Sequence, residues 1–150
     1  MKKLIDDFSV PRFHKTNNFV VKTLGTEHAS ADYEAVMSSI EHLRGKSPCG
    51  ADWPSPDLTL EQNLKDIAWH EDEFEKGISF AYAVFSPNEA DYMGCVYIMP
   101  SNDKNIDAEI WIWLKQSEKE KESLLETEIR EWILNQWPLD KTIYPNSKNG

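Results

Sequence analysis

The sequence predicts an α+β fold of three layers, in which a mixed, mostly antiparallel central sheet is flanked by helices. Two aromatic and β-branched runs, residues 78–85 and 92–99, surround a loop with Pro87 and Asn88 and should pair as an antiparallel hairpin. A third run, residues 106–114, alternates residue by residue and leads directly into a helical pattern. Helical periodicity also precedes the hairpin, so helices should pack on the sheet from both sides.

Length and charge limit the classes of function. A chain of 150 residues has room for one domain with a substantial core. Its 26 acidic residues outnumber its 16 basic residues, and the resulting formal charge of -10 repels the phosphate backbone of a nucleic acid. We therefore expect no nucleic-acid partner.

Cysteine usage and hydropathy favour a cytoplasmic location. Cys49 and Cys95 lack CxxC spacing and stand in dissimilar contexts, so neither a disulfide framework nor a metal site is expected. Asp6 and Asp7 interrupt the N-terminal sequence before a hydrophobic region of signal-peptide type can form. No apolar run approaches the roughly 20 residues that cross a bilayer, so we expect no membrane partner.

The chain divides into an arm, a domain and a tail. Residues 1–17 mix charge and proline without a period, which predicts an arm that lies on the domain. Residues 18–145 contain all the periodic segments and should form a single domain. Residues 146–150 are polar and are expected to fray.

One strand and two helices are predicted before the hairpin. Residues 19–24 are apolar and β-branched and end at Gly25, which is typical of a strand. Residues 28–43 repeat apolar side chains every three or four positions and should form one continuous helix. After a proline-rich loop, the capping-box spacing of Thr59 and Gln62 predicts a second helix that ends at Gly77. Its predicted buried face consists of Leu60, Leu64, Ile67, Ala68 and Phe74.

One strand, one helix and a short final strand are predicted after the hairpin. Residues 106–114 should form a strand whose successive side chains point to opposite faces of the sheet. One face then carries Ala108, Ile110, Ile112 and Leu114, and the other carries Glu109, Trp111 and Trp113. Ser117 and Glu120 have capping-box spacing, which predicts that the last helix begins there and ends before Pro138. Residues 142–144 should form the final strand.

The order of these elements resembles that of the GNAT superfamily of acetyl-CoA-dependent acyltransferases. Residues 18–24 look like the opening strand of that family, residues 80–85 with 94–98 look like its central hairpin, and residues 108–114 are similar to its fourth strand. Each segment is only a hydrophobic pattern, and their combination carries the resemblance. It covers roughly residues 18–145 and implies a GNAT-like fold and N-acetyltransferase activity.

The resemblance also implies a cofactor site with acetyl-CoA as co-substrate. In the family, the pantetheine arm lies along the fourth strand like an added strand, and the pyrophosphate meets the start of the following helix. Free backbone N–H groups and the helix dipole favour an anion at such a position. The cofactor contacts implied for this chain are Ile112, Trp113, Leu114, Lys115, Ser117, Lys119 and Ser123.

The sequence departs from the family pattern at two places. The glycine-containing phosphate loop of the family is replaced by residues 116–123, which contain no glycine and bring Glu118, Glu120 and Glu122 to the helix start. Side chains there crowd the approach of backbone to phosphate. The later helix that often supplies a tyrosine acid has no assigned counterpart, and Tyr144 is the nearest stand-in.

Acyl transfer to an amine requires a base for the proton of the nucleophile and a stabilised oxyanion. Glu109 is the predicted base, because it lies on the strand beside the expected thioester; the alternative is an exposed glutamate that is only solvated. Aromatic rings can hold a cationic amine, although core packing or a structural histidine explains the same residues. The predicted acceptor-binding residues are Trp53, His70, Tyr82 and Trp111.

The favoured function is an acetyl-CoA-dependent N-acetyltransferase that acts on an amine of a small molecule or peptide by direct attack. The missing glycines favour an alternative, a GNAT-fold binding or regulatory domain without CoA chemistry. A third interpretation is a sensor of aromatic or cationic ligands that uses the tryptophans. An unpaired last strand would also allow pairing with a second copy as a homodimer.

Overall fold

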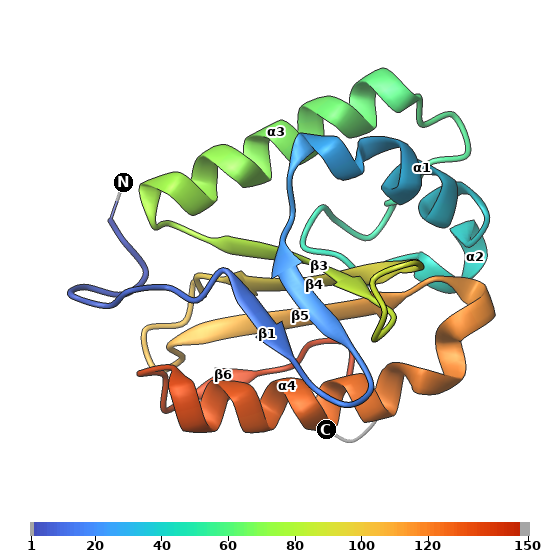
Figure 1. Ribbon diagram of the computed structural model, residues 1–150. Coiled ribbons are helices and arrows are strands. Elements are labelled where there is room, and N and C mark those ends of the chain that lie inside the picture. The colour runs from blue at the N-terminus through green and yellow to red at the C-terminus, as the bar shows by residue number, and fades with distance from the viewer. Residues whose placement is uncertain (1, 148–150) are drawn as a thin grey trace.

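The computed structural model describes residues 2–147, which form three layers (Figure 1). The middle layer is one six-stranded sheet whose strands lie side by side in chain order. Helices α1 (Ala29–Met37), α2 (Ile40–Leu43) and α3 (Leu60–Lys76) lie on one face, and α4 (Glu122–Gln136) lies on the other. The predicted fold class, a mixed and mostly antiparallel sheet flanked by helices, is confirmed. None of the helices in residues 2–147 is both long and apolar enough to span a membrane.

Every pair of neighbouring strands is antiparallel except the last. The strands are β1 (Phe13–Lys15), β2 (Val20–Thr23), β3 (Phe80–Phe85), β4 (Tyr92–Met99), β5 (Ala108–Leu114) and β6 (Thr142–Ile143). The parallel pair, β5 and β6, is joined only at Ala108 with Thr142 and at Glu109 with Ile143. Within residues 2–147, the outer edge of β5 beyond Glu109 therefore has no paired strand.

Most strands were predicted within two residues at each end. The exception is β1, which forms inside the segment predicted to be an arm and pairs antiparallel with β2. The sequence of β1 is Phe-His-Lys, with two exposed side chains, so it carries no run of buried residues that would reveal a strand.

The hydrogen-bond ladder determines which backbone groups reach the open edge of β5. The backbone N–H of Lys115 donates to the carbonyl of Met93 at 2.8 Å, so these two residues form a hydrogen-bonded antiparallel pair. Because such pairs alternate along the ladder, Trp113 also turns its backbone groups toward β4. Ile112 and Leu114 consequently turn theirs toward the open edge.

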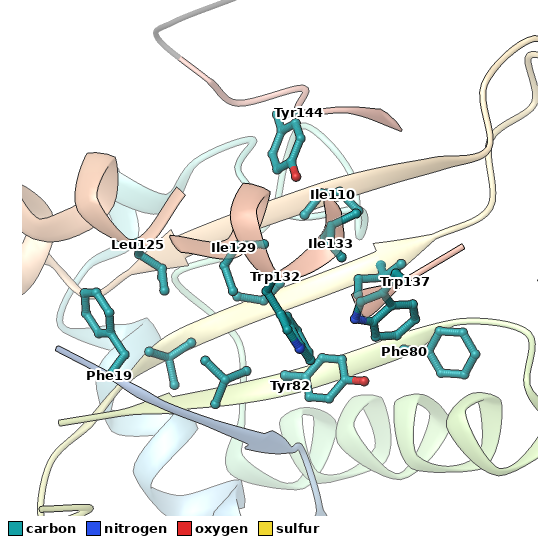
Figure 2. Close-up of a cluster of buried hydrophobic side chains, with 14 of the residues drawn as sticks. Phe19, Phe80, Tyr82, Ile110, Leu125, Ile129, Trp132, Ile133, Trp137 and Tyr144 are labelled. Atoms are coloured by element: carbon teal, nitrogen blue, oxygen red, sulfur yellow. The ribbon is translucent and has the colours of Figure 1, made fainter. Parts of the chain in front are cut away.

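The core between the sheet and α4 is aromatic (Figure 2). Trp132 of α4 packs nearly perpendicular to Tyr82, with ring centroids 5.2 Å apart, and Trp137 packs against Trp132 at 5.4 Å. The Tyr82 hydroxyl donates to the carbonyl of Pro11 at 2.6 Å. This bond fixes the N-terminal segment to the middle of the sheet.

The continuous helix predicted over residues 28–43 is wrong. A 3-10 turn, η1 (Thr26–His28), precedes α1, and α1 and α2 are separated at Ser38 and Ser39. The Ser38 hydroxyl donates to the carbonyl of Ala35 at 3.0 Å. Hydroxyls bonded in this way compete with the backbone ladder, which accounts for a break at consecutive serines.

The predicted start of the last helix is also wrong. Gln116–Lys121 form a 3-10 helix, η2, and α4 begins only at Glu122. Neither start has a side-chain cap, so the predicted capping box of Ser117 and Glu120 does not form. The carboxylate of Glu122 instead accepts the backbone N–H of Leu114 at 3.0 Å, which joins the helix start to the end of β5.

Helix α3 confirms the predicted capping box, but of the predicted buried face only Ile67 and Phe74 are buried. Leu60 and Leu64 are 44% and 41% exposed, and Ala68 is exposed as well. The side chains that α3 does bury are Asn63, Ile67, His70, Glu73 and Phe74. Asn63 can be buried because its amide donates to the Asp32 carboxylate of α1 at 2.8 Å.

Candidate functional site

The open edge of β5 borders a cavity at the start of α4. The cavity has a volume of about 90 Å³. Its walls come from β5, from η2 and α4, from the loop after α2 and from the segment after β6: Ile110, Ile112, Lys119, Glu122, Ser123, Glu126, Lys46, Tyr144, Asn146 and Ser147. Three of the predicted cofactor contacts, Ile112, Lys119 and Ser123, therefore lie together here.

Three donors converge on the carboxylate of Glu122 in this wall. Besides the Leu114 N–H, its Oε2 lies 2.7 Å from Nε2 of His42, and its Oε1 lies 3.4 Å from Nζ of Lys46. The side chains of His42, Glu122 and Lys46 are only 12%, 19% and 23% exposed. A backbone N–H, an imidazole and an ammonium group thus surround one half-buried carboxylate.

Sequence reasoning missed His42 and Lys46 and treated Glu122 only as negative charge near a helix start. Helix α2 ends at Leu43 and Lys46 lies in the loop after it, so the i, i+4 spacing of His42 and Lys46 is not a helical pattern. Lys46 and Glu122 are 76 residues apart in the sequence, so no local pattern connects them.

The segment after β6 closes the cavity on its far side. Tyr144 is buried beside Ile110 (Figure 2), and the Arg130 guanidinium lies 3.8 Å from the centre of its ring. Burial raises the pKa of Tyr144 to about 12, so its hydroxyl keeps its proton at neutral pH. The Ser147 hydroxyl donates to the Glu126 carboxylate at 2.9 Å.

These residues suit the pantetheine arm of a CoA molecule but not its pyrophosphate. Ile112 turns its backbone groups to an open strand edge, which suits an extended arm that adds to the sheet. The Leu114 N–H is already bonded to Glu122, and the cavity is far smaller than the roughly 300 Å³ or more of typical ligand pockets. At the helix start, where the resemblance implies a pyrophosphate, the backbone N–H of Leu114 is thus bonded to a side chain of the protein.

Lys115 and Ser117 lie apart from this cavity. They line a groove between α1 and η2 together with Ala31, Glu34, Ala35, Ser38, Asp91, Tyr92 and Gln116. The Gln116 N–H donates to the Ser39 hydroxyl at 2.8 Å, which holds η2 against the break between α1 and α2. The structure therefore separates Lys115 and Ser117 from Ile112, Lys119 and Ser123.

Trp113 lies on neither surface. Its ring is fully buried on the α1–α3 face, where Nε1 donates to the Tyr97 hydroxyl at 3.0 Å and the ring packs against Trp53 at 5.9 Å. Trp53 is thus brought to the sheet by an aromatic contact. Tyr82 lies on the opposite face beneath α4, so the structure does not bring it together with the other predicted acceptor residues.

The candidate base, Glu109, is half-buried at the last position where β5 and β6 pair. Its Oε1 accepts the indole N–H of Trp111 at 3.3 Å. This contact orients the carboxylate on the α1–α3 face, where Trp111 is also half-buried. The side chain therefore has a fixed position next to the point at which the two strands separate.

His70 of α3 is buried against the same face of the sheet. It is 5% exposed, and its ring packs on Tyr97 at 5.1 Å and on Trp69 at 5.0 Å. Burial lowers the pKa of His70 to about 4, so the imidazole is neutral at physiological pH. Its Nδ1 has no hydrogen-bond partner among residues 2–147.

A buried polar cluster between α1, α3 and β4 was not predicted. The Asp32 carboxylate accepts from the Tyr92 hydroxyl, from the Asn63 amide and from the Cys95 thiol. Burial raises the pKa of Asp32 and that of Cys95. Cys95 is therefore held as a thiol. In the described part of the chain, no three His, Cys, Asp or Glu side chains are placed to hold a metal ion.

No family model matches the sequence, and no curated protein sequence matches it. Solved structures do match. The ribosomal-protein-S5-alanine acetyltransferase from Vibrio fischeri superposes with a TM-score of 0.68 at 14% identity, over 91% of this chain and 76% of that one. RimL, a ribosomal L7/L12 alpha-N-protein acetyltransferase in complex with coenzyme A, gives 0.63 at 17% identity, over 79% and 66%. RimJ of Mycobacterium smegmatis, in complex with CoA-disulfide, gives 0.65 at 13% identity, over 91% and 69%.

These similarities define the class of fold. The chain has the fold of the GNAT superfamily, as the resemblance in the sequence predicted. It spans 66% to 76% of the length of the three structures. Two of them contain coenzyme A or its disulfide, and two are named as acetyltransferases of ribosomal proteins.

Proposed function

We propose that this chain is an N-acetyltransferase of the GNAT type that acts on the amine of a peptide N-terminus or of a small molecule. The observation that carries the proposal is the open edge of β5 beside the start of α4, in a fold shared with ribosomal-protein acetyltransferases. The names of those neighbours favour a peptide acceptor, and the formal charge of -10 attracts a cationic amine.

In this proposal Glu109 accepts the proton of the attacking amine, directly or through a water molecule. A general base must have a defined position within hydrogen-bond reach of the nucleophile. The indole N–H of Trp111 supplies that position by holding one carboxylate oxygen and leaving the other available. Trp111 is therefore a positioning residue, and its half-buried ring offers a flat surface for the acceptor.

The proposed binding site for the acceptor amine lies on the α1–α3 face of the sheet. Trp53, His70 and Trp111 all belong to this face, and Trp69 next to His70 is 51% exposed. Because His70 is neutral, it does not repel an ammonium group. Tyr82 takes no part, since it is buried beneath α4.

The test is an acetylation assay read by mass spectrometry. Purified protein is incubated with millimolar acetyl-CoA and a panel of peptides with free Ser or Ala N-termini, together with small polyamines. We expect an acetylated product, and Glu109→Gln should lower kcat/KM by about 10²- to 10⁴-fold without changing Tm. Glu61→Gln, which removes an exposed glutamate from α3, serves as the control. An absence of product with every amine contradicts the proposal.

A GNAT-fold binding domain without acyl transfer is the second candidate function. The carboxylate of Glu122 at the helix start and the lack of glycine in residues 116–123 favour it. The two candidates predict different results in the acetylation assay. A binding domain produces no acetylated amine even at saturating acetyl-CoA, whereas an enzyme does.

A further inference from the structure

We propose that His42, Lys46 and the backbone N–H of Leu114 form an anion-binding site that the chain fills with its own Glu122 carboxylate, which thereby competes with phosphate-bearing ligands. The site itself consists of contacts within this chain. Its relevance to acetyl-CoA rests on the proposed function.

The geometry is that of a built anion site. The three donors come from separate segments, the end of β5, helix α2 and the loop after it, and all lie within 3.4 Å of the same carboxylate. Glu122 is also the first residue of the 15-residue helix α4, where the helix dipole favours negative charge. Electrostatics and hydrogen bonding therefore select an anion at this point, and the carboxylate supplies it.

The same donors suit a phosphate group. Carboxylate and phosphate oxygens accept the same charge-assisted hydrogen bonds from lysine, histidine and backbone N–H groups. Lys119 and Ser123 line the same cavity and would add an ammonium and a hydroxyl. Glu122 is partly exposed, so its side chain can turn toward solvent and leave the three donors in place.

The tethered carboxylate has a concentration advantage over a ligand in solution. A group attached beside its site acts at an effective concentration in the millimolar range or higher. A phosphate-bearing ligand must therefore displace Glu122, which lowers its apparent affinity. Removal of this one negative charge should expose the donors and tighten the binding of an anion.

The test is calorimetric titration of the full chain with inorganic pyrophosphate at neutral pH. Glu122→Gln keeps an oxygen that can accept from Leu114 but removes the charge. Glu120→Gln removes the same charge from an exposed position in η2 and is the matched control. We expect Glu122→Gln to bind pyrophosphate at least about tenfold more tightly than the wild type and the control. Addition of Lys46→Ala to Glu122→Gln should abolish the gain.

A purely structural role for Glu122 predicts a different result. If the carboxylate only joins α4 to β5 and α2, Glu122→Gln lowers Tm and binds pyrophosphate no better than Glu120→Gln, and that outcome overturns the proposal. Glu122→Asp provides a second variant, because its shorter side chain keeps the charge but cannot reach all three donors. A gain with Glu122→Asp supports the proposal if Glu122→Gln does not fold, and no gain rejects it.

Repetition of the titration with coenzyme A separates this inference from the proposed function. Tighter pyrophosphate binding by Glu122→Gln, together with no CoA binding and no acetylation by any variant, supports the anion site and rejects the N-acetyltransferase. Acetylation by the wild type with equal pyrophosphate affinities in Glu122→Gln and Glu120→Gln supports the N-acetyltransferase and rejects the anion site.

Discussion

At Gly94 the neighbouring strands β4 and β5 lie too close together for any side chain. A Cβ atom there would be 2.0 Å from the carbonyl oxygen of Trp113 and 2.9 Å from Cα of Leu114. Both contacts are backbone, so only separation of the strands can relieve them. We expect Gly94→Ala to lower the free energy of unfolding by about 3 kcal/mol, at the upper end of small-to-large substitutions, as measured by urea denaturation.

Gly45→Ala is the matched control for this prediction. Gly45 has a φ of 77° and no atom within 4 Å of a Cβ placed on it, so its substitution meets backbone strain but no clash. The left-handed conformation alone should cost about 1 kcal/mol. An equal loss of stability in the two variants would show that the close approach at Gly94 is not what limits the substitution.

Among the elements, α3 and α4 begin in different ways although both carry a capping-box sequence. Thr59 caps α3, where its hydroxyl accepts the backbone N–H of Gln62 at 3.1 Å. Ser117 caps neither η2 nor α4. We expect Thr59→Ala to cost about 1 kcal/mol of stability and Ser117→Ala less than about 0.5 kcal/mol, as measured by urea denaturation. Equal losses would contradict this assignment of the caps.

The sequence predicted the elements whose determinants are local. Thr59 and Gln62 satisfy each other within one turn, so their spacing is sufficient to locate the start of α3. The start of α4 depends on Glu122, whose partner His42 is 80 residues away, and no local pattern contains that contact. The burial of Asn63 on α3 was missed for the same reason, because it depends on a bond to Asp32 of another helix.

The candidate site likewise combines residues that local sequence patterns indicate with residues that only contacts between distant segments bring in. Ile112, Lys119 and Ser123 line one cavity, as expected from strand alternation and the chain's turn into η2 and α4, which are local features. Tyr82 was assigned to the wrong group of neighbours, since every residue of β3 is buried and an all-apolar strand gives no sign of which face is which. His42 was not predicted, because it belongs to the site only through its tertiary contact with Glu122.

On the scale of the whole molecule, the two faces of the sheet differ in their titratable groups. The core beneath α4 consists of apolar and aromatic side chains (Figure 2), whereas the α1–α3 side buries Asp32, His70 and Cys95. Buried groups with shifted pKa values link folding to pH. The pH dependence of stability should therefore be determined largely by the α1–α3 side.

His70 permits a signed prediction for that dependence. Burial lowers its pKa from 6.5 to about 4, so between these values the unfolded chain binds a proton that the folded chain does not. The contribution of His70 is complete above pH 6.5 and is lost as the pH falls toward 4, by about 3 kcal/mol in total. Asp32 acts in the opposite direction, because its raised pKa favours the protonated folded state at low pH.

His70→Phe isolates this contribution, since phenylalanine can keep the ring contacts with Tyr97 and Trp69 but does not titrate. The variant also removes the unpartnered Nδ1, so its stability near pH 7 should equal or exceed that of the wild type by up to about 1 kcal/mol. Urea denaturation at several values from pH 7 to 4.5 should show that the wild type loses stability on acidification more steeply than the variant. Parallel curves would mean that His70 titrates normally in the folded protein, and the packing described around it would have to be looser than the structure shows.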